Sequence, residues 1–207
     1  IGPMNSYSEL VAYAETVHML GVRFLPSGLS RFIQLPLHEL TNQRICADEV
    51  TNFFDASFAE RLCEENNFGD RINIIEELFI KSLYKYDLQT DPQIVFAIEQ
   101  INRHQGKLPV QSLVEDICLC QRQFERKFKM NTGYTPKIYS RIMQFKNAVD
   151  LLRSATCDNL LSTAVHAGYY DVPHLSREIK RMSGNTPYSF LALPSPEEEV
   201  TLTYVEA

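Results

Sequence analysis

Arginine and lysine recur at matching positions in two segments of the chain. Arg126 corresponds to Arg177 and Lys129 corresponds to Lys180, an offset of 51 residues in both cases. An arginine guanidinium is a planar fork of donors that pairs bidentately with a guanine edge, whereas a lysine ammonium acts as a point charge that suits phosphate. The repeated residue types therefore fit recognition of an anionic polymer that displays base edges.

The two segments match beyond these charges. Each ends in Gly-x-Thr-Pro, which begins at Gly133 in the first segment and at Gly184 in the second. Apolar positions correspond as well: Phe124 with Leu175, and Phe128 with Ile179. Because these apolar residues follow helical spacing, they are expected to form the buried face of a helix in each segment.

Each segment is predicted to hold two short helices with a tight turn between them, the helix-turn-helix arrangement. The expected helices are Val110–Cys118 and Gln121–Met130, then Leu160–Ala167 and Val172–Met182, with a long linker helix over Lys137–Ser154. Gly168 stands where the second turn needs a left-handed backbone, and Asp171 is placed to cap the helix that follows.

The N-terminal half has a different pattern. Residues 17–24 alternate as a strand would, and a loop follows to about residue 46. Beyond it, Asp48 and Asp70 are each expected to cap a helix, the first continuing through Phe58. Asp91 with Pro92 predicts a third helix start, because proline fits the first helical turn.

The formal net charge of −6 is unevenly distributed. Residues 107–193 hold 12 basic and 7 acidic side chains, a net +5, whereas residues 1–106 hold 8 and 15. Residues 194–207 hold 4 acidic side chains and no basic one. A basic block within an acidic chain is typical of a nucleic-acid-binding domain beside a domain of another kind.

Other kinds of site find little support in the sequence. The five cysteines show no CxxC spacing, so we expect reduced thiols in a cytoplasmic protein without a metal or cofactor. Cys118-Leu119-Cys120 and His174 lack further residues at ligand spacing. No apolar run is longer than that of Leu10–Ala14, which is too short for a transmembrane helix, and no signal peptide is expected.

The repeated segments resemble the two DNA-binding subdomains of arabinose-regulator (AraC) type transcription factors. The first resemblance lies in Arg122-x-Phe-x-Arg126-x-Phe-Lys129 with Gly133-x-Thr-Pro. The second lies in Gly168-Tyr-Tyr-Asp171-x-x-His-Leu-x-Arg-x-Ile-Lys-Arg with Gly184-x-Thr-Pro. Pro173, Ile179 and Gln144 depart from the family pattern. The resemblance implies a mainly α fold, with two helix-turn-helix motifs, at about 110–133 and 160–184, joined by the linker helix.

The resemblance also implies roles for individual residues, since the N-terminal half of each recognition helix enters the major groove in this family. The implied base-reading residues are Arg122, Glu125, Arg126, Val172, Pro173, Ser176 and Arg177. The basic residues assigned to phosphate are Lys129, Lys137, Lys180 and Arg181. Glutamate can accept from cytosine, and valine or proline can contact a thymine methyl.

A weaker resemblance covers about residues 21–83. Gly21-Val-Arg-Phe-x-Pro-x-Gly28 and Leu35-Pro-x-x-Glu-Leu40 are similar to the end of the cupin-like sensor domain in a subset of these regulators. The expected organisation is a sensor remnant with a small β part (1–46), a helical linker and dimerisation region (47–106), the DNA-binding domain (107–193) and an acidic tail (194–207). A fragment beginning at Ile1 would lack part of the sensor.

These observations predict a sequence-specific regulator of transcription that binds double-stranded DNA and has no enzymatic activity. The N-terminal region is the expected place for a small-molecule effector and for homodimer formation. Two alternatives stay open: an alkyl-transfer DNA repair protein with a cysteine acceptor, and a protein-interaction module that has lost DNA binding. The first needs an activated thiolate, and no cysteine has a histidine or an obvious cation beside it in the sequence.

Overall fold

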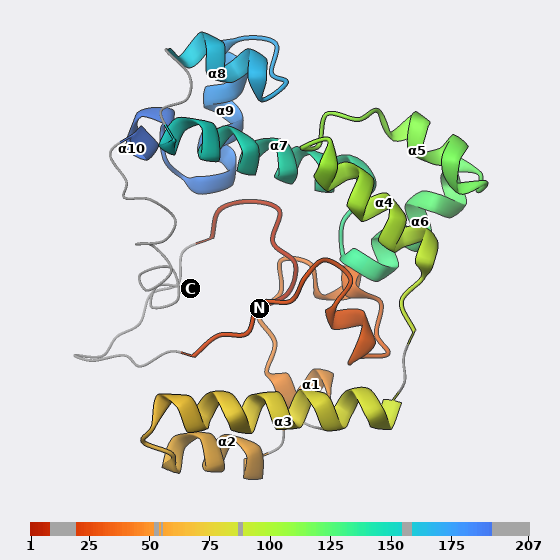
Figure 1. Ribbon diagram of the computed structural model, residues 1–207, viewed down its shortest axis with the longest axis vertical. Helices are drawn as coiled ribbons and strands as arrows, with labels where there is room; N and C mark the ends of the chain where they lie inside the picture. The colour runs from red at the N-terminus through yellow and green to blue at the C-terminus, as the bar shows by residue number, and fades with distance from the viewer. Residues whose placement is uncertain (9–19, 52–53, 55, 87–88, 155–158, 192–207) are drawn as a thin grey trace. The chain divides into compact units, whose positions relative to one another are not determined.

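A computed structural model describes residues 1–8, 20–51, 54, 56–86, 89–154 and 159–191. These residues form α-helices and short 3-10 helices and include no strand (Figure 1). The mainly α fold predicted from the sequence is therefore confirmed. Cys157 and the acidic residues of the predicted tail lie outside the described residues.

The helices have the following bounds. Two 3-10 helices span Leu29–Arg31 and Leu37–Leu40. The first four α-helices are α1 (Ala47–Val50), α2 (Ala56–Glu64), α3 (Phe68–Tyr86) and α4 (Pro92–Arg103). The remaining six are α5 (Val110–Ile117), α6 (Gln121–Thr132), α7 (Pro136–Arg153), α8 (Leu160–His166), α9 (Val172–Ser183) and α10 (Pro187–Leu191). From α5 to α9, each helix begins and ends within two residues of its predicted bounds, whereas α10 was not predicted.

The chain folds as two compact units. The first comprises Ile1–Pro3, Phe24–Phe96 and Arg122–Thr135. The second comprises Met4–Arg23, Ala97–Gln121 and Pro136–Ala207. Helix α6 therefore belongs to the first unit, and helices α7 to α10 belong to the second.

In the first unit, Phe79 of α3 joins the N-terminal loops to the helices. Its ring lies 4.9 Å from the ring centroid of Phe32, 5.3 Å from that of Phe24 and 5.7 Å from that of Phe54. All three contacts are edge-to-face, an arrangement that the aromatic quadrupole favours. A neighbouring cluster buries Ile33, Leu37 and Leu40. Helix α3 is thus packed through Phe79 against the aromatic side chains of this unit.

The prediction of a single helix from Asp48 through Phe58 is wrong. The chain forms α1, then leaves the helix at Thr51, whose φ of −144° and ψ of 148° are extended, and begins α2 at Ala56. Thr51 is β-branched and aromatic residues follow it, so local helix propensity is low where the break occurs.

Asp70 is also not the cap expected of it. Helix α3 begins two residues earlier, at Phe68, and the side chain of Asn67 accepts hydrogen bonds from the backbone N–H groups of Gly69 and Asp70, at 2.8 and 3.3 Å. Asp70 lies instead within the first turn, where the helix dipole favours a carboxylate. The cap predicted at Asp91 is confirmed, because its Oδ1 accepts from the backbone N–H of Gln93 at 3.0 Å.

The predicted strand over residues 17–24 is absent where the structure describes it. Residues 17–19 lie outside the described residues, and residues 20–24 form no strand. Leu20 and Val22 are exposed and Phe24 is half-buried, so most of the face that alternation predicts is not buried. A strand needs a partner to accept its backbone hydrogen bonds, and no described residue supplies one.

The second unit is built round helices α7 to α10. Their shared core contains residues that are almost fully buried: Ala148, Val149 and Leu152 of α7, Ala164 of α8, Leu175 and Ile179 of α9, and Phe190 of α10. Alanine at 148 and 164 lets the helix backbones approach closely without leaving a void. This core holds α9, the second predicted recognition helix, by its apolar face.

Candidate nucleic-acid interface

The turn before α9 has the geometry that the sequence predicts. Gly168 adopts φ 83°, and the backbone N–H of Tyr169 returns to the carbonyl of Ala164 at 2.8 Å. Asp171 then caps α9 by accepting from the backbone N–H of His174 at 2.7 Å. The left-handed glycine and the N-cap are both confirmed.

A Cβ at position 168 would meet neighbouring side chains as well as an unfavourable φ. It would lie 2.9 Å from Cγ of Lys107 and 3.2 Å from Nε2 of Gln144. Lys107 also donates from Nζ to the carbonyl of His166 at 3.2 Å, at the C-terminal end of α8, where the helix dipole favours a cation. The turn is therefore held by its own backbone and by the hydrogen bond from Lys107, and the side chain of Gln144 leaves no room for a Cβ.

Helix α9 presents a polar stripe opposite its buried face. Leu175, Glu178 and Ile179 are buried, whereas Pro173, Arg177 and Lys180 are exposed. Ser176 lies half-buried between the exposed positions, and Arg181 is exposed at the end of the helix. Val172 is half-buried and lines an apolar hollow with Leu161 and Tyr188.

Helix α6 in the first unit has the same division of faces. Phe124, Phe128 and Thr132 are buried, and the rings of the two phenylalanines meet at 5.7 Å. The outward positions are Arg122, Arg126 and Lys129, all exposed, with the half-buried Glu125 among them. The turn before this helix differs from the second, since Cys118 rather than a glycine adopts the left-handed conformation, with φ 56°.

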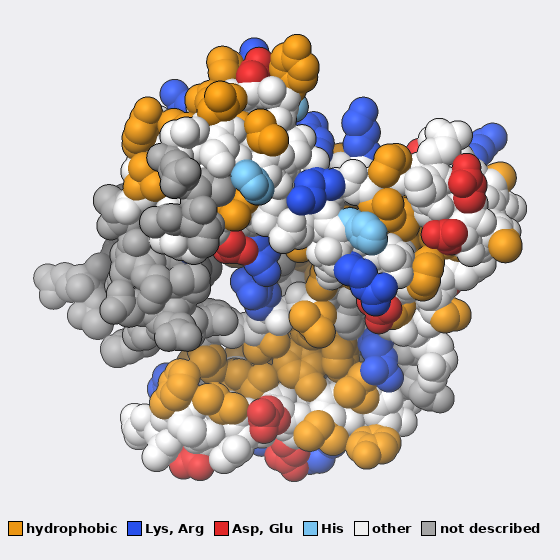
Figure 2. Space-filling view, turned by 45° about the horizontal axis from the view of Figure 1, so that its top comes forward, with side chains coloured by type: hydrophobic (Ala, Val, Ile, Leu, Met, Phe, Trp, Pro, Cys, Tyr) orange, Lys and Arg blue, Asp and Glu red, His pale blue; other side chains and the backbone are white. Residues whose placement is uncertain are grey.

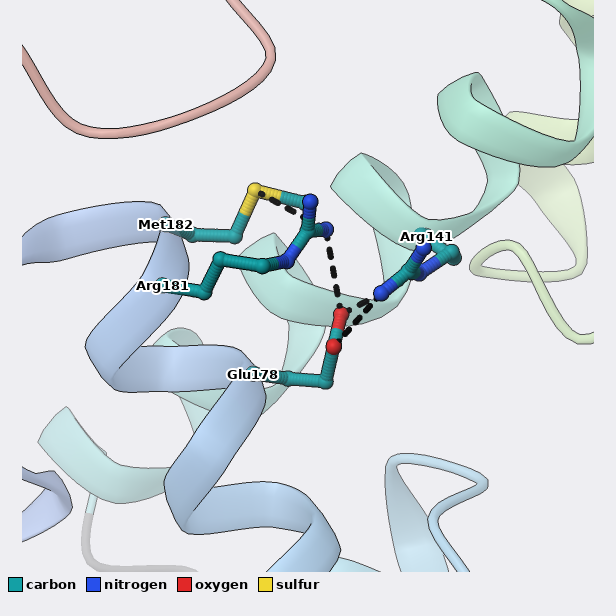
Figure 3. Close-up of polar contacts among 4 residues, drawn as sticks. All are labelled: Arg141, Glu178, Arg181 and Met182. Atoms are coloured by element: carbon teal, nitrogen blue, oxygen red, sulfur yellow. Dashed lines mark hydrogen bonds and ion pairs between the residues drawn. The ribbon is translucent and has the colours of Figure 1, made fainter.

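An ion cluster lies on the inner side of α9 (Figure 3). Arg141 of α7 donates from Nη2 to Oε1 of Glu178 at 2.6 Å and from Nε to Oε2 at 3.2 Å. Arg181 donates to Oε2 at 3.3 Å. Burial by itself raises the pKa of Glu178, but the hydrogen bonds and charges of the two arginines outweigh it and hold the pKa below its usual value. Glu178 is therefore a charged group near the core.

Burial dominates at two tyrosines of the second unit. Desolvation raises the pKa of Tyr139 to about 12, and its hydroxyl donates a hydrogen bond to Oδ1 of Asn102 at 2.8 Å. Burial and the nearby charge of Glu178 raise the pKa of Tyr169. Both phenols are neutral over the physiological range, so neither supplies charge to this surface.

Hydrophobic side chains gather over α8 in the space-filling view (Figure 2). Leu161 and Val165 are 57% and 62% exposed.

None of the helices in the described ranges is both long and apolar enough to cross a membrane. The described residues also contain no group of three or more side chains suited to holding a metal ion.

Comparison with known proteins identifies this region. A family model described as a helix-turn-helix domain matches residues 113–192, a range that includes both predicted recognition helices. Residues 113–192 thus match a helix-turn-helix domain, the kind of domain that the two repeated segments predict. A second family model, described as a domain of unknown function (DUF6597), matches residues 1–46. None of the curated proteins matches the chain.

One solved structure is similar to part of this chain. It is described as the structure of the xylose-binding transcription activator xylR. The similarity covers 52% of this chain and 28% of the xylR chain, with 20% sequence identity and a TM-score of 0.46. This chain thus matches less than a third of the length of the xylR chain.

Within the matched helix-turn-helix domain, the structure gives the predicted site residues two different environments. Those on the outward stripes of α6 and α9 are exposed or half-buried, as is Lys137 in the first turn of α7. Arg181 differs, because it also contacts the buried carboxylate of Glu178. Contacts of any of these side chains with DNA stay predictions.

The sequence analysis did not predict the ion pair on the inner side of recognition helix α9. Glu178 interrupts the apolar face of α9 between Leu175 and Ile179, and a charge at such a position signals a buried partner. The partner, Arg141, lies 37 residues away on another helix, so spacing alone does not reveal it.

Proposed function

We propose that this chain is a sequence-specific DNA-binding transcription regulator whose helices α6 and α9 read two successive major grooves of double-stranded DNA. The observation that carries this proposal is the matched pair of outward stripes. Arg122, Glu125, Arg126 and Lys129 on α6 correspond, at an offset of 51 residues, to Pro173, Ser176, Arg177 and Lys180 on α9. A repeat that preserves an outward polar face, as well as a core, is expected where that face binds the same polymer twice.

Arginines near the middle of each stripe are the proposed base readers. Arg126 and Arg177 are exposed, each lies within the first two turns of its helix, and the guanidinium fork matches O6 and N7 of guanine. Arg122 and Pro173 lie one turn closer to the helix start, with Val172 beside Pro173. Glu125 and Ser176 supply acceptors between them.

The lysines at the ends of the stripes are the proposed phosphate contacts. Lys129 and Lys180 are exposed one turn beyond the base-reading arginines, and Lys137 is exposed in the first turn of α7. Arg181 is proposed for the same role with the donors that Glu178 leaves available. Because the whole chain carries −6, non-specific attraction to DNA must come from the basic block over 107–193.

The rest of the chain is proposed to regulate this domain. We place effector binding and homodimer formation in residues 1–106, which are acidic and lack the repeated stripe. Catalysis is not part of the proposal. We also propose a cytoplasmic location, as expected for a DNA-binding regulator of bacterial type.

Binding to DNA upstream of its own coding sequence tests the proposal. Fluorescence anisotropy of the full chain with that DNA, against a scrambled duplex of equal composition, should give at least about a thousandfold preference at physiological salt. Equal affinity for the two duplexes would contradict sequence-specific recognition. Adding candidate small ligands to the same titration tests the proposed effector.

A further inference from the structure

Two ion pairs occupy equivalent positions in the repeat. On α6, Nζ of Lys127 lies 2.9 Å from Oδ2 of Asp91. On α9, the residue 51 positions later is Glu178, whose Oε1 lies 2.6 Å from Nη2 of Arg141. In each case the charge lies on the inner side of a recognition helix, and its partner belongs to the helix that precedes the motif. Asp91 is the N-cap of α4, and Arg141 lies in α7.

The charged residue on each recognition helix directly follows the proposed base-reading arginine. Lys127 follows Arg126, and Glu178 follows Arg177. Successive side chains on an α-helix are separated by about 100° of rotation. If the inner charge is held in place, the direction in which the preceding arginine points is fixed with it.

In each pair the carboxylate is the more buried partner, whereas the cation is 37% exposed for Lys127 and 39% exposed for Arg141, and each pair is reinforced by a second contact. The Glu178 side chain is 10% exposed, and Arg141 binds both of its oxygens as a fork. Asp91 is 21% exposed and uses its two oxygens differently, since Oδ1 caps α4 and Oδ2 accepts from Lys127. Lys127 also donates to the side chain of Gln93 at 3.0 Å.

The two pairs have opposite polarity. The recognition helix carries the cation in the first motif and the anion in the second. Lys127 would be repelled by Arg141, and Glu178 would be repelled by Asp91. Each helix can therefore pair only with the support of its own motif, which excludes an exchange between two otherwise similar repeats.

We propose that Asp91 and Arg141 are positioning residues that set the rotation of α6 and α9 and thereby the specificity of DNA reading. The proposal rests on the proposed function. It assigns a role to side chains on the inner side of each recognition helix, whereas the predicted DNA contacts lie on the outward stripes.

Asp91→Asn tests the first pair cleanly. Asparagine keeps a side-chain oxygen that can cap α4 but removes the charge that binds Lys127. The affinity ratio between the specific duplex and a random duplex should fall about tenfold, while random-duplex affinity and its salt dependence stay unchanged. An unchanged ratio would overturn the role assigned to Asp91.

Arg141→Met tests the second pair, with Lys146→Met as the matched control. Lys146 is an exposed cation on the same helix, so both variants remove one positive charge from α7. Only Arg141→Met should lower the specificity ratio, again by about tenfold, and Arg141→Lys should recover part of the loss. Equal losses on specific and random DNA, with a weaker salt dependence, would identify Arg141 as a phosphate contact instead.

The double variant Arg141→Met with Glu178→Met separates positioning from folding. The double variant also removes the buried Glu178 carboxylate, which Arg141→Met leaves without its main partner. Its free energy of unfolding should therefore return toward that of the original chain. Its specificity ratio should nevertheless stay low, because the ion pair proposed to set the rotation of α9 is still absent. A ratio that recovers with stability would overturn the proposal. Should the unaltered chain bind all DNA equally, the proposed function would fail, a result distinct from any of these.

Discussion

The side chain of Asp171 accepts a hydrogen bond from the backbone N–H of His174 at a distance of 2.7 Å. Asp171 has extended backbone angles, φ −153° and ψ 171°, and α9 starts at the next residue. This contact satisfies one of the first backbone donors of α9, which have no partner within the helix. It therefore fixes where α9 begins and so where its outward stripe is presented.

Loss of this cap should weaken the fold measurably. Asp171→Ala is expected to lower the free energy of unfolding by about 1 kcal/mol, whereas Asp171→Asn should cost only a fraction of that, because asparagine caps equally well. Urea unfolding followed by circular dichroism measures both. Equal losses for the two variants would mean that the carboxylate acts through its charge and not as a cap.

Gly168 should tolerate no side chain. Its φ of 83° disfavours any L-residue, and a Cβ there would lie 2.9 Å from Cγ of Lys107. Gly168→Ala is therefore expected to cost about 1 kcal/mol or more in the free energy of unfolding. Gly21→Ala is the matched control, since an added Cβ there meets nothing within 4 Å. Similar stability for the two variants would contradict this account of the turn.

Local signals in the sequence predicted the second motif well. Gly168, Asp171 and the apolar spacing of Leu175 and Ile179 each specify backbone geometry within a few residues, and the structure has that geometry. The break at Thr51 and the cap at Asn67 were missed, because several nearby polar residues can start a helix and tertiary contacts decide among them.

The ion pairs on the inner sides of α6 and α9 could not be predicted from the sequence. The contact between Arg141 and Glu178 joins two helices, and that between Asp91 and Lys127 spans 36 residues. A sequence pattern shows that a charge occupies an inner position, but pairing depends on how the helices pack. The outward residues were easier to predict, because helical periodicity alone separates them from the core.

Arg126 and Arg177 should affect specific binding most. Replacing either with alanine is expected to cost about 1–3 kcal/mol on the specific duplex and much less on random DNA, because a base-edge contact is lost. Titrations of both duplexes at one salt concentration measure the difference. Equal losses on the two duplexes would place these arginines on the DNA backbone.

Lys129 and Lys180 should behave in the opposite way. Replacing one with alanine is expected to weaken specific and random binding alike and to reduce the slope of log affinity against log salt by about one. Titrations at four or five salt concentrations measure the slope. A specific-only loss with an unchanged slope would make the lysine a base reader.

The Glu178 carboxylate should contribute stability that depends on pH. Because its pKa is lowered in the folded chain, its contribution is complete above the ordinary value of 4.5 and is lost as the pH falls through the lowered value. The stability advantage of the original chain over Glu178→Gln should therefore shrink between pH 6 and pH 3. A constant difference across that range would show that the arginines do not favour the charged form.

A footprint of the full chain on its specific DNA tests two-groove reading most directly. Hydroxyl-radical cleavage should show protection at two patches on one face of the duplex, centred about 10–10.5 base pairs, or 34 Å, apart. Arg126→Ala should remove the patch assigned to α6, and Arg177→Ala should remove the patch assigned to α9. Protection confined to a single half-turn, or loss of both patches together in each variant, would contradict the account.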